Sequence, residues 1–215
     1  ETISAGCFKV EFIHVNHSIA DSVAFAIKTP IGTVVQTGDF KIDVTPLQGE
    51  MTDLTRFGEL GREGVLALLM DSTNVERPGH SLSESKVHDR FDQLFKDCDK
   101  RIIVTTFASN VDRIRQIIDL AVKYKRKVGI TGRSMENVVK LCVELGYMKV
   151  PDGILVDMKR IGSVPRNKLV ILSTGSQGES MSALYRMAFS EHKQVDIGSG
   201  DRVIISASAI PGNET

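Results

Sequence analysis

Two short polar stretches near the start of the chain contain the residues best suited to chemistry. His14 and His17 stand three residues apart, Asp21 follows them, and Asp39 comes directly after Gly38. Imidazole and ionised carboxylate bind zinc and similar ions, and a carboxylate bridging two cations about 3.5–4 Å apart supports phosphodiester cleavage. The spacing is unspecific, because His-x-x-His is not the His-Glu-x-x-His of zincins. On spacing alone, structural roles in turns are favoured for His17 and Asp39.

A glycine-rich stretch, Thr-Gly-Ser-Gln-Gly-Glu at 174–179, is a candidate for phosphate binding. If it joins a strand to a helix, the backbone N–H groups of Gly175, Ser176 and Gln177 suit an anion. The stretch also nearly matches the Gly-x-Ser-x-Gly of serine hydrolases. However, a threonine replaces the first glycine, and the only later histidine is His192, in a polar stretch. A plain glycine-rich turn of a doubly wound sheet is an equal alternative to phosphate binding.

A third group of polar residues lies at another expected strand-to-helix junction, at 107–113. It contains Ser109, Asn110 and Arg113, and Arg133 lies in the next junction. In a parallel sheet these loops and the glycine-rich stretch share the carboxyl edge, where ligands bind. Exposed N–H groups with arginines there would suit a polynucleotide backbone. Helix capping and solvated charge are the structural alternative, which the local sequence favours.

The elements that position these residues fall into two groups. Alternating apolar and polar residues predict neighbouring antiparallel strands at the start of the chain, then a loop with a short helix and a continuous apolar run that predicts a buried strand. Strands and helices then alternate, which predicts a parallel sheet covered by helices. The early elements are strands at 8–13, 23–28, 33–37 and 65–70 and a helix at 53–60. The later ones are strands at 101–107, 127–131, 168–173 and 202–206 and helices at 84–95, 111–125, 135–148 and 181–189.

Apolar residues at helical spacing predict the faces by which two of these helices pack on the sheet. The polar stretch 74–83 separates the mainly β part from the α/β part, which predicts domains at 1–73 and 74–215. Asn110 and Ser134 occupy the expected N-cap positions of the two helices. The expected buried faces are Val111, Ile114, Ile118, Ala121 and Val122 in one helix and Val138, Leu141, Cys142 and Leu145 in the other.

The composition restricts the class of protein without indicating a partner. Of 215 residues, 41% are hydrophobic and 25% charged, as in soluble globular proteins with a real core. Basic and acidic residues are equal at 27 each, so no overall charge attracts nucleic acid or membrane. Cys7, Cys98 and Cys142 are odd in number and far apart, which favours a reduced, cytoplasmic setting. No apolar stretch approaches the roughly 20 residues of a membrane span, so we expect none.

Taken together, five motifs are more specific than any one of them. In order, they resemble the bacterial ribonuclease J proteins, which belong to the β-CASP branch of the metallo-β-lactamase superfamily. The resemblance runs along essentially the whole chain. The motifs are Asn-His-Ser-Ile-Ala-Asp-Ser at 16–22, Thr-Gly-Asp-Phe-Lys at 37–41, Asp-Ser-Thr-Asn at 71–74, the glycine-rich stretch at 174–179 and Ile-Pro-Gly-Asn-Glu at 210–214.

This resemblance implies an α/β fold: the later part of a metallo-β-lactamase αββα domain at 1–73, followed by a Rossmann-like β-CASP domain at 74–215. It implies that His17 and Asp39 are metal ligands, that Asp39 bridges two zinc ions, and that Asp71 supports the catalytic centre. The implied activity is cleavage of single-stranded RNA, both internally and by 5′-to-3′ exonuclease action. A metal-activated hydroxide would attack phosphorus.

The departures from the family pattern shape the expectation for this chain. The family's His-x-His-x-Asp-His motif should precede His17, and two further histidine motifs should follow the Pro-Gly-Asn-Glu stretch. We therefore expect a piece of a longer protein that keeps two ligands, binds zinc weakly or not at all, and is not itself catalytic. It would retain the RNA-contacting residues named above. The alternative is a non-catalytic module for RNA binding or dimerisation in an RNA-decay complex, the intact parent being a homo-oligomer.

Overall fold

The computed structural model describes residues 1–47, 49–179 and 181–207. The chain divides into two compact units, 1–87 and 88–215, and each is described by itself. The predicted boundary between residues 73 and 74 falls within the first of these units. None of the helices in the described ranges combines the length and apolar character needed to cross a membrane.

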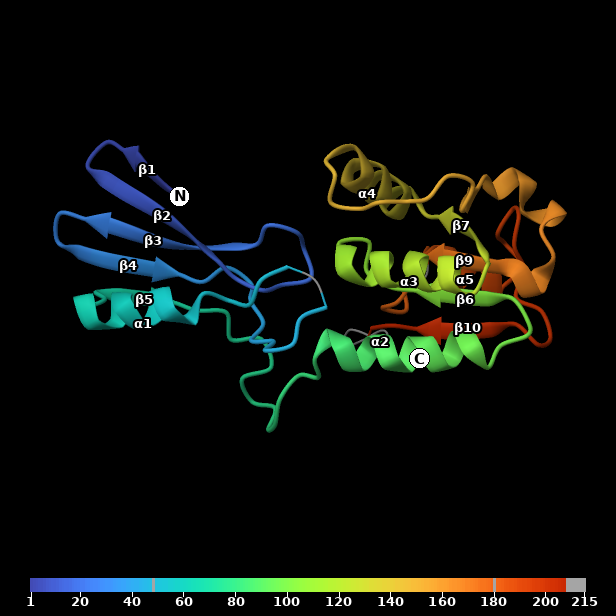
Figure 1. Ribbon diagram of the computed structural model, residues 1–215, viewed down its shortest axis with the longest axis horizontal. Coiled ribbons are helices and arrows are strands. Elements are labelled where there is room, and N and C mark those ends of the chain that lie inside the picture. The colour runs from blue at the N-terminus through green and yellow to red at the C-terminus, as the bar shows by residue number, and fades with distance from the viewer. Residues whose placement is uncertain (48, 180, 208–215) are drawn as a thin grey trace. The chain divides into compact units, whose positions relative to one another are not determined.

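The first unit contains a mixed sheet, the first sheet, with its strands in sequence order (Figure 1). The first four strands form an antiparallel meander, and the last pairs in parallel with the fourth. The predicted antiparallel neighbours are therefore confirmed, with an added first strand. The strands are β1 (Thr2–Ala5), β2 (Phe8–His14), β3 (Val23–Thr29), β4 (Gly32–Gln36) and β5 (Ala67–Leu69), and the helix is α1 (Leu54–Glu63).

The core of the first unit forms between the middle strands and α1. Asp53 caps α1 by accepting the N–H of Arg56 at 2.9 Å. Arg56 also donates to both carboxylate oxygens of Glu11 in β2, at 2.7 and 2.9 Å, which ties the helix to the sheet. The buried apolar residues are Ile13, Val15, Ala24, Ala26, Val35 and Leu60, with Phe40 and Phe57 packed against them.

The prediction of a buried strand at 65–70 is wrong in its burial. The strand β5 exists, but its residues are exposed; Leu68 is 57% and Leu69 55% exposed. Within the described part of the chain, β5 pairs only with β4, at the edge of the sheet. Because α1 packs on residues from β2, β3 and β4, none of the described elements covers the apolar side chains of β5.

The second unit is a parallel sheet, the second sheet, in the order β10-β6-β9-β7-β8, with helices between the strands. This confirms the predicted α/β fold with a parallel sheet. Its strands are β6 (Ile102–Thr105), β7 (Lys127–Thr131), β8 (Leu155–Val156), β9 (Leu169–Ser173) and β10 (Arg202–Ile205). Its helices are α2 (Glu84–Lys96), which begins just before the unit, α3 (Val111–Lys123), α4 (Arg133–Glu144) and α5 (Ala183–Ala188), with 3₁₀ turns η1 (Met158–Ser163) and η2 (Arg166–Lys168).

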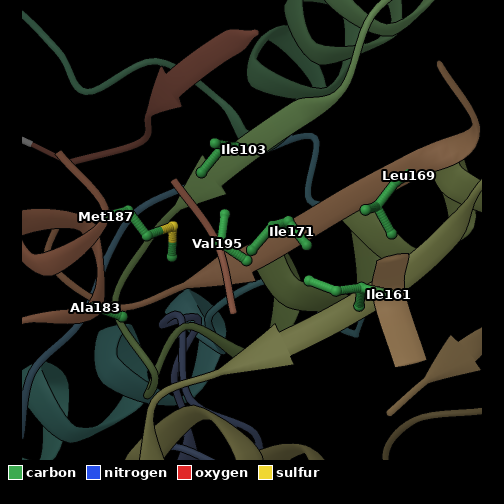
Figure 2. Packing of buried hydrophobic residues seen from close by; sticks show 7 residues of the cluster. All are labelled: Ile103, Ile161, Leu169, Ile171, Ala183, Met187 and Val195. Carbon is green, nitrogen blue, oxygen red and sulfur yellow. The ribbon is translucent and has the colours of Figure 1, made fainter. Parts of the chain in front are cut away.

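Alternate residues of the second sheet point to two buried faces. On one face, residues of β6 and β9 pack with α5, η1 and Val195, and in Figure 2 Val195 lies between Met187 and Ile171. Val104 and Leu172, which point to the opposite face of the sheet, are fully buried. The helix α3 packs against β7 and α4. The first cluster consists of Ile103, Ile161, Leu169, Ile171, Ala183, Met187 and Val195.

The predicted face of α3 is largely confirmed, whereas that of α4 is right for Cys142 and wrong for Leu141 and Leu145, which are exposed. In α4 the buried residues are Met135, Val139 and Cys142, and Leu141 is 53% exposed. Ser134 is not the N-cap, because α4 begins at Arg133 after Gly132. The buried face of α4 therefore consists of residues at positions i, i+4 and i+7, counted from Met135. In α3, Val122 is also outside the buried face, at 37% exposed.

Candidate functional site

The candidate metal-binding residues follow strands that end at one edge of the first sheet. The end of β2 at His14 pairs with the start of β3 at Val23. The end of β4 at Gln36 pairs with the end of β5 at Leu69. The loops after β2, β4 and β5 therefore leave the sheet at the same edge, which we call the first-sheet edge.

Hydrogen bonds hold these loops against one another. The N–H of Lys41 donates to the carbonyl of Asn16 at 2.7 Å, joining the loop after β2 to the loop after β4. The N–H of Thr37 donates to the carbonyl of Leu69 at 3.0 Å, and the N–H of Asp71 donates to Thr37 Oγ1 at 3.0 Å. The structure thus brings together the segments that carry all three residues predicted for the catalytic centre.

The side chains of these three residues differ in how they are engaged. His17 is half-buried and Asp39 exposed, and within the described residues neither side chain makes a hydrogen bond. Asp71 accepts the N–H of Thr73 at 2.8 Å. Hydrogen bonds from Thr73 chiefly, then the Phe40 N–H and the nearby His17 ring, lower the pKa of Asp71. Asp71 is therefore held as an anion beside His17, while the His17 and Asp39 side chains are not engaged in hydrogen bonds among the described residues.

His14 and Asp21 do not join this group. His14 Nε2 lies 3.0 Å from the carbonyl of Glu50, so its ring bonds another loop. Asp21 is exposed and has a φ of +55°, which aspartate tolerates in a turn. The His14 side chain therefore has a structural contact.

The donor set fits zinc in chemistry but not in number. His17 and Asp39 offer the imidazole and carboxylate that zinc takes, but catalytic zinc sites use three protein ligands and structural ones four. Among the residues that the structure describes, no three His, Cys, Asp or Glu side chains are grouped so as to hold a metal ion. The described residues alone therefore supply too few ligands for a zinc centre.

The candidate RNA-contacting residues lie where the strands of the second sheet end. Three loop segments leave its carboxyl edge: 106–110 before α3, the turn at Gly132 before α4, and 174–179 on the way to α5. We call this the second-sheet edge. All seven predicted residues lie in these loops or in the first turns of the helices, as the parallel sheet requires.

The first of these loops is shaped largely by capping. Asn110 Oδ1 accepts the N–H of Arg113 at 3.0 Å and caps α3, as predicted. The Arg113 side chain is buried, donates to Ser206 Oγ and lies over the ring of Phe91, 5.9 Å from its centroid. Ser109 is exposed. The side chains of Asn110 and Arg113 thus stabilise this loop and the start of α3, and their contact with RNA stays a prediction.

The other two loops lie against each other. Gly132 has a φ of +107°, and a Cβ added there would lie 2.8 Å from Thr174 Oγ1. Arg133, the next residue, is exposed. In the glycine-rich loop Gly175 and Ser176 are buried, and the N–H of Gln177 donates to a Glu179 carboxylate oxygen at 3.2 Å. That N–H is satisfied by an acceptor within its own loop.

Buried hydroxyl groups at this edge were missed by the sequence analysis. Thr105 and Ser173 end β6 and β9, and Thr106 directly follows β6. The side-chain oxygens of all three are buried without a hydrogen-bond partner among the described residues. Thr105 and Ser173 are register partners, and Ser173 is also the register partner of Thr131. A hydroxyl residue ending each of three adjacent strands was visible in the sequence, but the register that aligns them was not.

The serine hydrolase interpretation of Ser176 is wrong. His192 is buried rather than part of a solvated polar stretch. Its Nε2 lies 2.9 Å from Thr131 Oγ1, and its Nδ1 accepts the N–H groups of Gln194 and Val195. Both ring nitrogens are therefore used, and neither can act as a base for Ser176.

Comparison with known proteins agrees with this geometry. The second unit belongs by its parallel sheet and edge loops to the class of Rossmann-like α/β domains. The sequence model of the family described as "Ribonuclease J, beta-CASP domain" matches residues 99–215, more than half of the chain. The chain belongs to the ribonuclease J family.

Relatives in several bacteria carry the same name. The chain is 49% identical over 212 residues to a ribonuclease J of Helicobacter pylori, covering 99% of this chain and 31% of the relative. It is 50% identical to one of Synechocystis, covering 96% and 32%, and 45% identical to one of Thermus thermophilus, covering 96% and 36%. The chain thus spans about a third of the length of these relatives.

A solved structure shows the same fold at low sequence identity. A crystal structure of a protein of unknown function from Enterococcus faecalis superposes with a TM-score of 0.61. It is 16% identical, and the match covers 95% of this chain and 55% of that one. This likeness concerns the fold alone.

Proposed function

We propose that the protein is part of a zinc-dependent ribonuclease that cleaves single-stranded RNA, internally and from the 5′ end, in the cytoplasm. Family membership supports the activity. The three unpaired cysteines support a reducing compartment. The observation that carries the proposal is the bonded first-sheet edge, which gathers the segments of His17, Asp39 and Asp71.

In this proposal each of the three residues has a distinct task. His17 and Asp39, whose side chains are not engaged in hydrogen bonds among the described residues, would hold zinc together with ligands from other parts of the enzyme. When bound, zinc would supply the activated hydroxide and stabilise negative charge at phosphorus. Asp71, held as an anion by Thr73, orients the His17 ring electrostatically. With two such ligands, we infer that the 215-residue chain itself is not catalytic.

The second-sheet edge is proposed to contact the RNA backbone. Arg133 and Ser109 are exposed there, next to the glycine-rich loop with Gly175, Ser176 and Gln177. Asn110 and Arg113 shape the loop that presents Ser109. Because the chain has no net charge, its RNA affinity must come from a local surface such as this one.

A salt titration of RNA binding tests this proposal. Fluorescence anisotropy with a labelled, 5′-monophosphorylated oligouridylate should show binding that weakens with salt, by about 0.7 in log–log slope per phosphate contacted. Replacing Arg133 by Gln should reduce the slope by about one such contact. Arg160→Gln, at an exposed position in η1, is the matched control. Absence of binding at low salt would refute the RNA surface.

One observation favours a second candidate, a docking or dimerisation module. Leu141 and Val143 of α4 and Leu145 just after it are 53%, 42% and 61% exposed, leaving apolar surface on that helix. Sedimentation velocity over a dilution series tests it. A dimer that survives dilution and is lost in Leu141→Glu would support this candidate, and a monomer at every concentration would exclude self-association.

A further inference from the structure

The ring of His192 has a single tautomer dictated by its neighbours. The side chain is 9% exposed. Its Nδ1 accepts the backbone N–H of Gln194 at 3.3 Å and of Val195 at 3.2 Å. A nitrogen facing two donors carries no proton, so the proton of the neutral ring lies on Nε2. Nε2–H therefore donates to Thr131 Oγ1, at 2.9 Å.

This bond acts on the turn that precedes α4. Thr131 is the last residue of β7, and Gly132, with φ of +107°, is the N-cap of α4 without any side-chain cap. Gly132 in turn fits closely against Thr174, the first residue after β9. Through Thr131, the His192 ring thus holds two neighbouring loops of the second-sheet edge. Arg133 directly follows this turn as the first residue of α4.

We propose that neutral His192 is a positioning residue for RNA binding, which holds the turn at 131–133 and the glycine-rich loop in place and releases them when it is protonated. The inference rests on the proposed RNA surface. Protonation would place a second N–H, at Nδ1, against the two backbone donors of Gln194 and Val195. Because Nε2 keeps its proton in the charged ring, the bond to Thr131 breaks only if the ring moves. The loop after α5 would have to rearrange and carry the ring away from Thr131.

The burial of the ring and the charged groups around it determine the pH at which His192 is protonated. Burial is the main factor that lowers the pKa of His192, and the positive charge of Arg186 on α5 lowers it further. The negative charge of Asp196, in the segment after the ring, opposes both. The neutral ring is therefore the form present at neutral pH, and acidification charges it at a lower pH than an ordinary histidine.

Two measurements on the full chain test the proposal. In NMR titrations from neutral pH down to the acid limit of the folded state, the Nδ1 and Nε2 shifts of His192 should report the Nε2–H tautomer, and the amides of Gly132 and Arg133 should shift with the same midpoint. Amides that do not follow His192 would overturn the positioning role. This readout does not depend on RNA, so it is decided even if the proposed RNA surface is wrong.

RNA affinity gives the second measurement, using the same labelled oligouridylate at constant ionic strength. The wild type should lose about fivefold in affinity on protonation of His192, within the range of couplings through packed networks. His192→Gln and Thr131→Val should bind about fivefold more weakly at pH 7.5 and lack this acid step. His80→Gln, at an exposed position of the first unit, should behave as the wild type. An unchanged acid step in Thr131→Val, which keeps the volume of the side chain, would overturn the proposal.

Discussion

Asn110 at the second-sheet edge caps a helix and is also proposed to contact RNA, and substitutions can separate the two roles. Its side-chain oxygen caps α3. An aspartate can make the same cap but adds a negative charge.

We expect Asn110→Asp to change the free energy of unfolding by less than about 0.5 kcal/mol and to weaken RNA binding. Asn110→Ala should lose about 1 kcal/mol of stability. Urea unfolding and anisotropy on the same samples measure both, and unchanged RNA affinity in Asn110→Asp would place RNA away from this loop.

The His192 ring predicts a specific pH dependence of stability. Its folded-state pKa is lowered, chiefly by burial, below the unfolded value of about 6.5. As pH falls below 6.5 the unfolded chain therefore binds the proton first, and stability is lost until the folded-state pKa is passed. Urea unfolding at a series of pH values should show this loss in the wild type. It should be absent in His192→Gln and retained in His80→Gln.

Asp43 is a buried carboxylate whose role was not apparent from the sequence. It accepts the N–H groups of Thr45 at 3.0 Å and Glu84 at 2.9 Å, and Lys41 Nζ lies 3.5 Å away. Burial would raise the pKa of Asp43, but these hydrogen bonds and Lys41 outweigh it and lower the pKa. We expect Asp43→Asn to cost about 1.5–3 kcal/mol of unfolding free energy by urea denaturation. Asp152→Asn, at an exposed position, should cost almost nothing.

The site residues that the sequence revealed and those it hid differ in a physical way. His17 and Asp39 were found because they lie in local motifs that occur in a fixed order. Thr105, Ser173 and His192 were missed because their environment depends on strands far apart in sequence. A hydroxyl or an imidazole is polar in any sequence pattern, and only the register of the sheet makes it buried.

At the scale of helices and strands, their positions in the sequence could be predicted from local patterns, whereas their burial depends on the tertiary structure. Alternation and helical periodicity located most strands and helices, since these patterns arise within one segment. The burial of β5 was misjudged because it depends on which elements cover the strand. The buried stripe of α4 was misjudged because its start is fixed by Gly132, which fits against Thr174 from another loop.

The glycine-rich loop predicts a cost for any side chain at Gly175. Its φ is +107°, and a Cβ there would meet the side chain of Ser182 and lie 2.9 Å from Leu184 Cβ. We expect Gly175→Ala to lower the unfolding free energy by about 1–3 kcal/mol and to weaken RNA binding by displacing the loop. In Gly162→Ala, where an added Cβ meets nothing within 4 Å, stability should change little. A fully stable Gly175→Ala would show that the loop can move without cost.

At the scale of the whole molecule, function depends on how local charges are placed. Equal numbers of acidic and basic residues leave no net charge. The two units also offer different chemistry: imidazole and carboxylate groups at the first-sheet edge, and an exposed arginine beside the glycine-rich loop at the second. RNA retention and metal binding should therefore be separable, since variants at one edge leave the other unchanged.

Metal content tests that separation and the number of ligands together. With His17 and Asp39 as its ligands, the chain should retain less than one zinc ion after desalting, because affinity falls steeply when ligands are few. Combined His17→Ala and Asp39→Ala should reduce even weak zinc binding in calorimetry but leave oligouridylate affinity unchanged. Asp21→Asn, at a turn position that asparagine also tolerates, is the matched control for the change of charge. Two zinc ions retained per chain would mean that further ligands complete the site, and equal zinc binding in the double variant would exclude His17 and Asp39 as ligands.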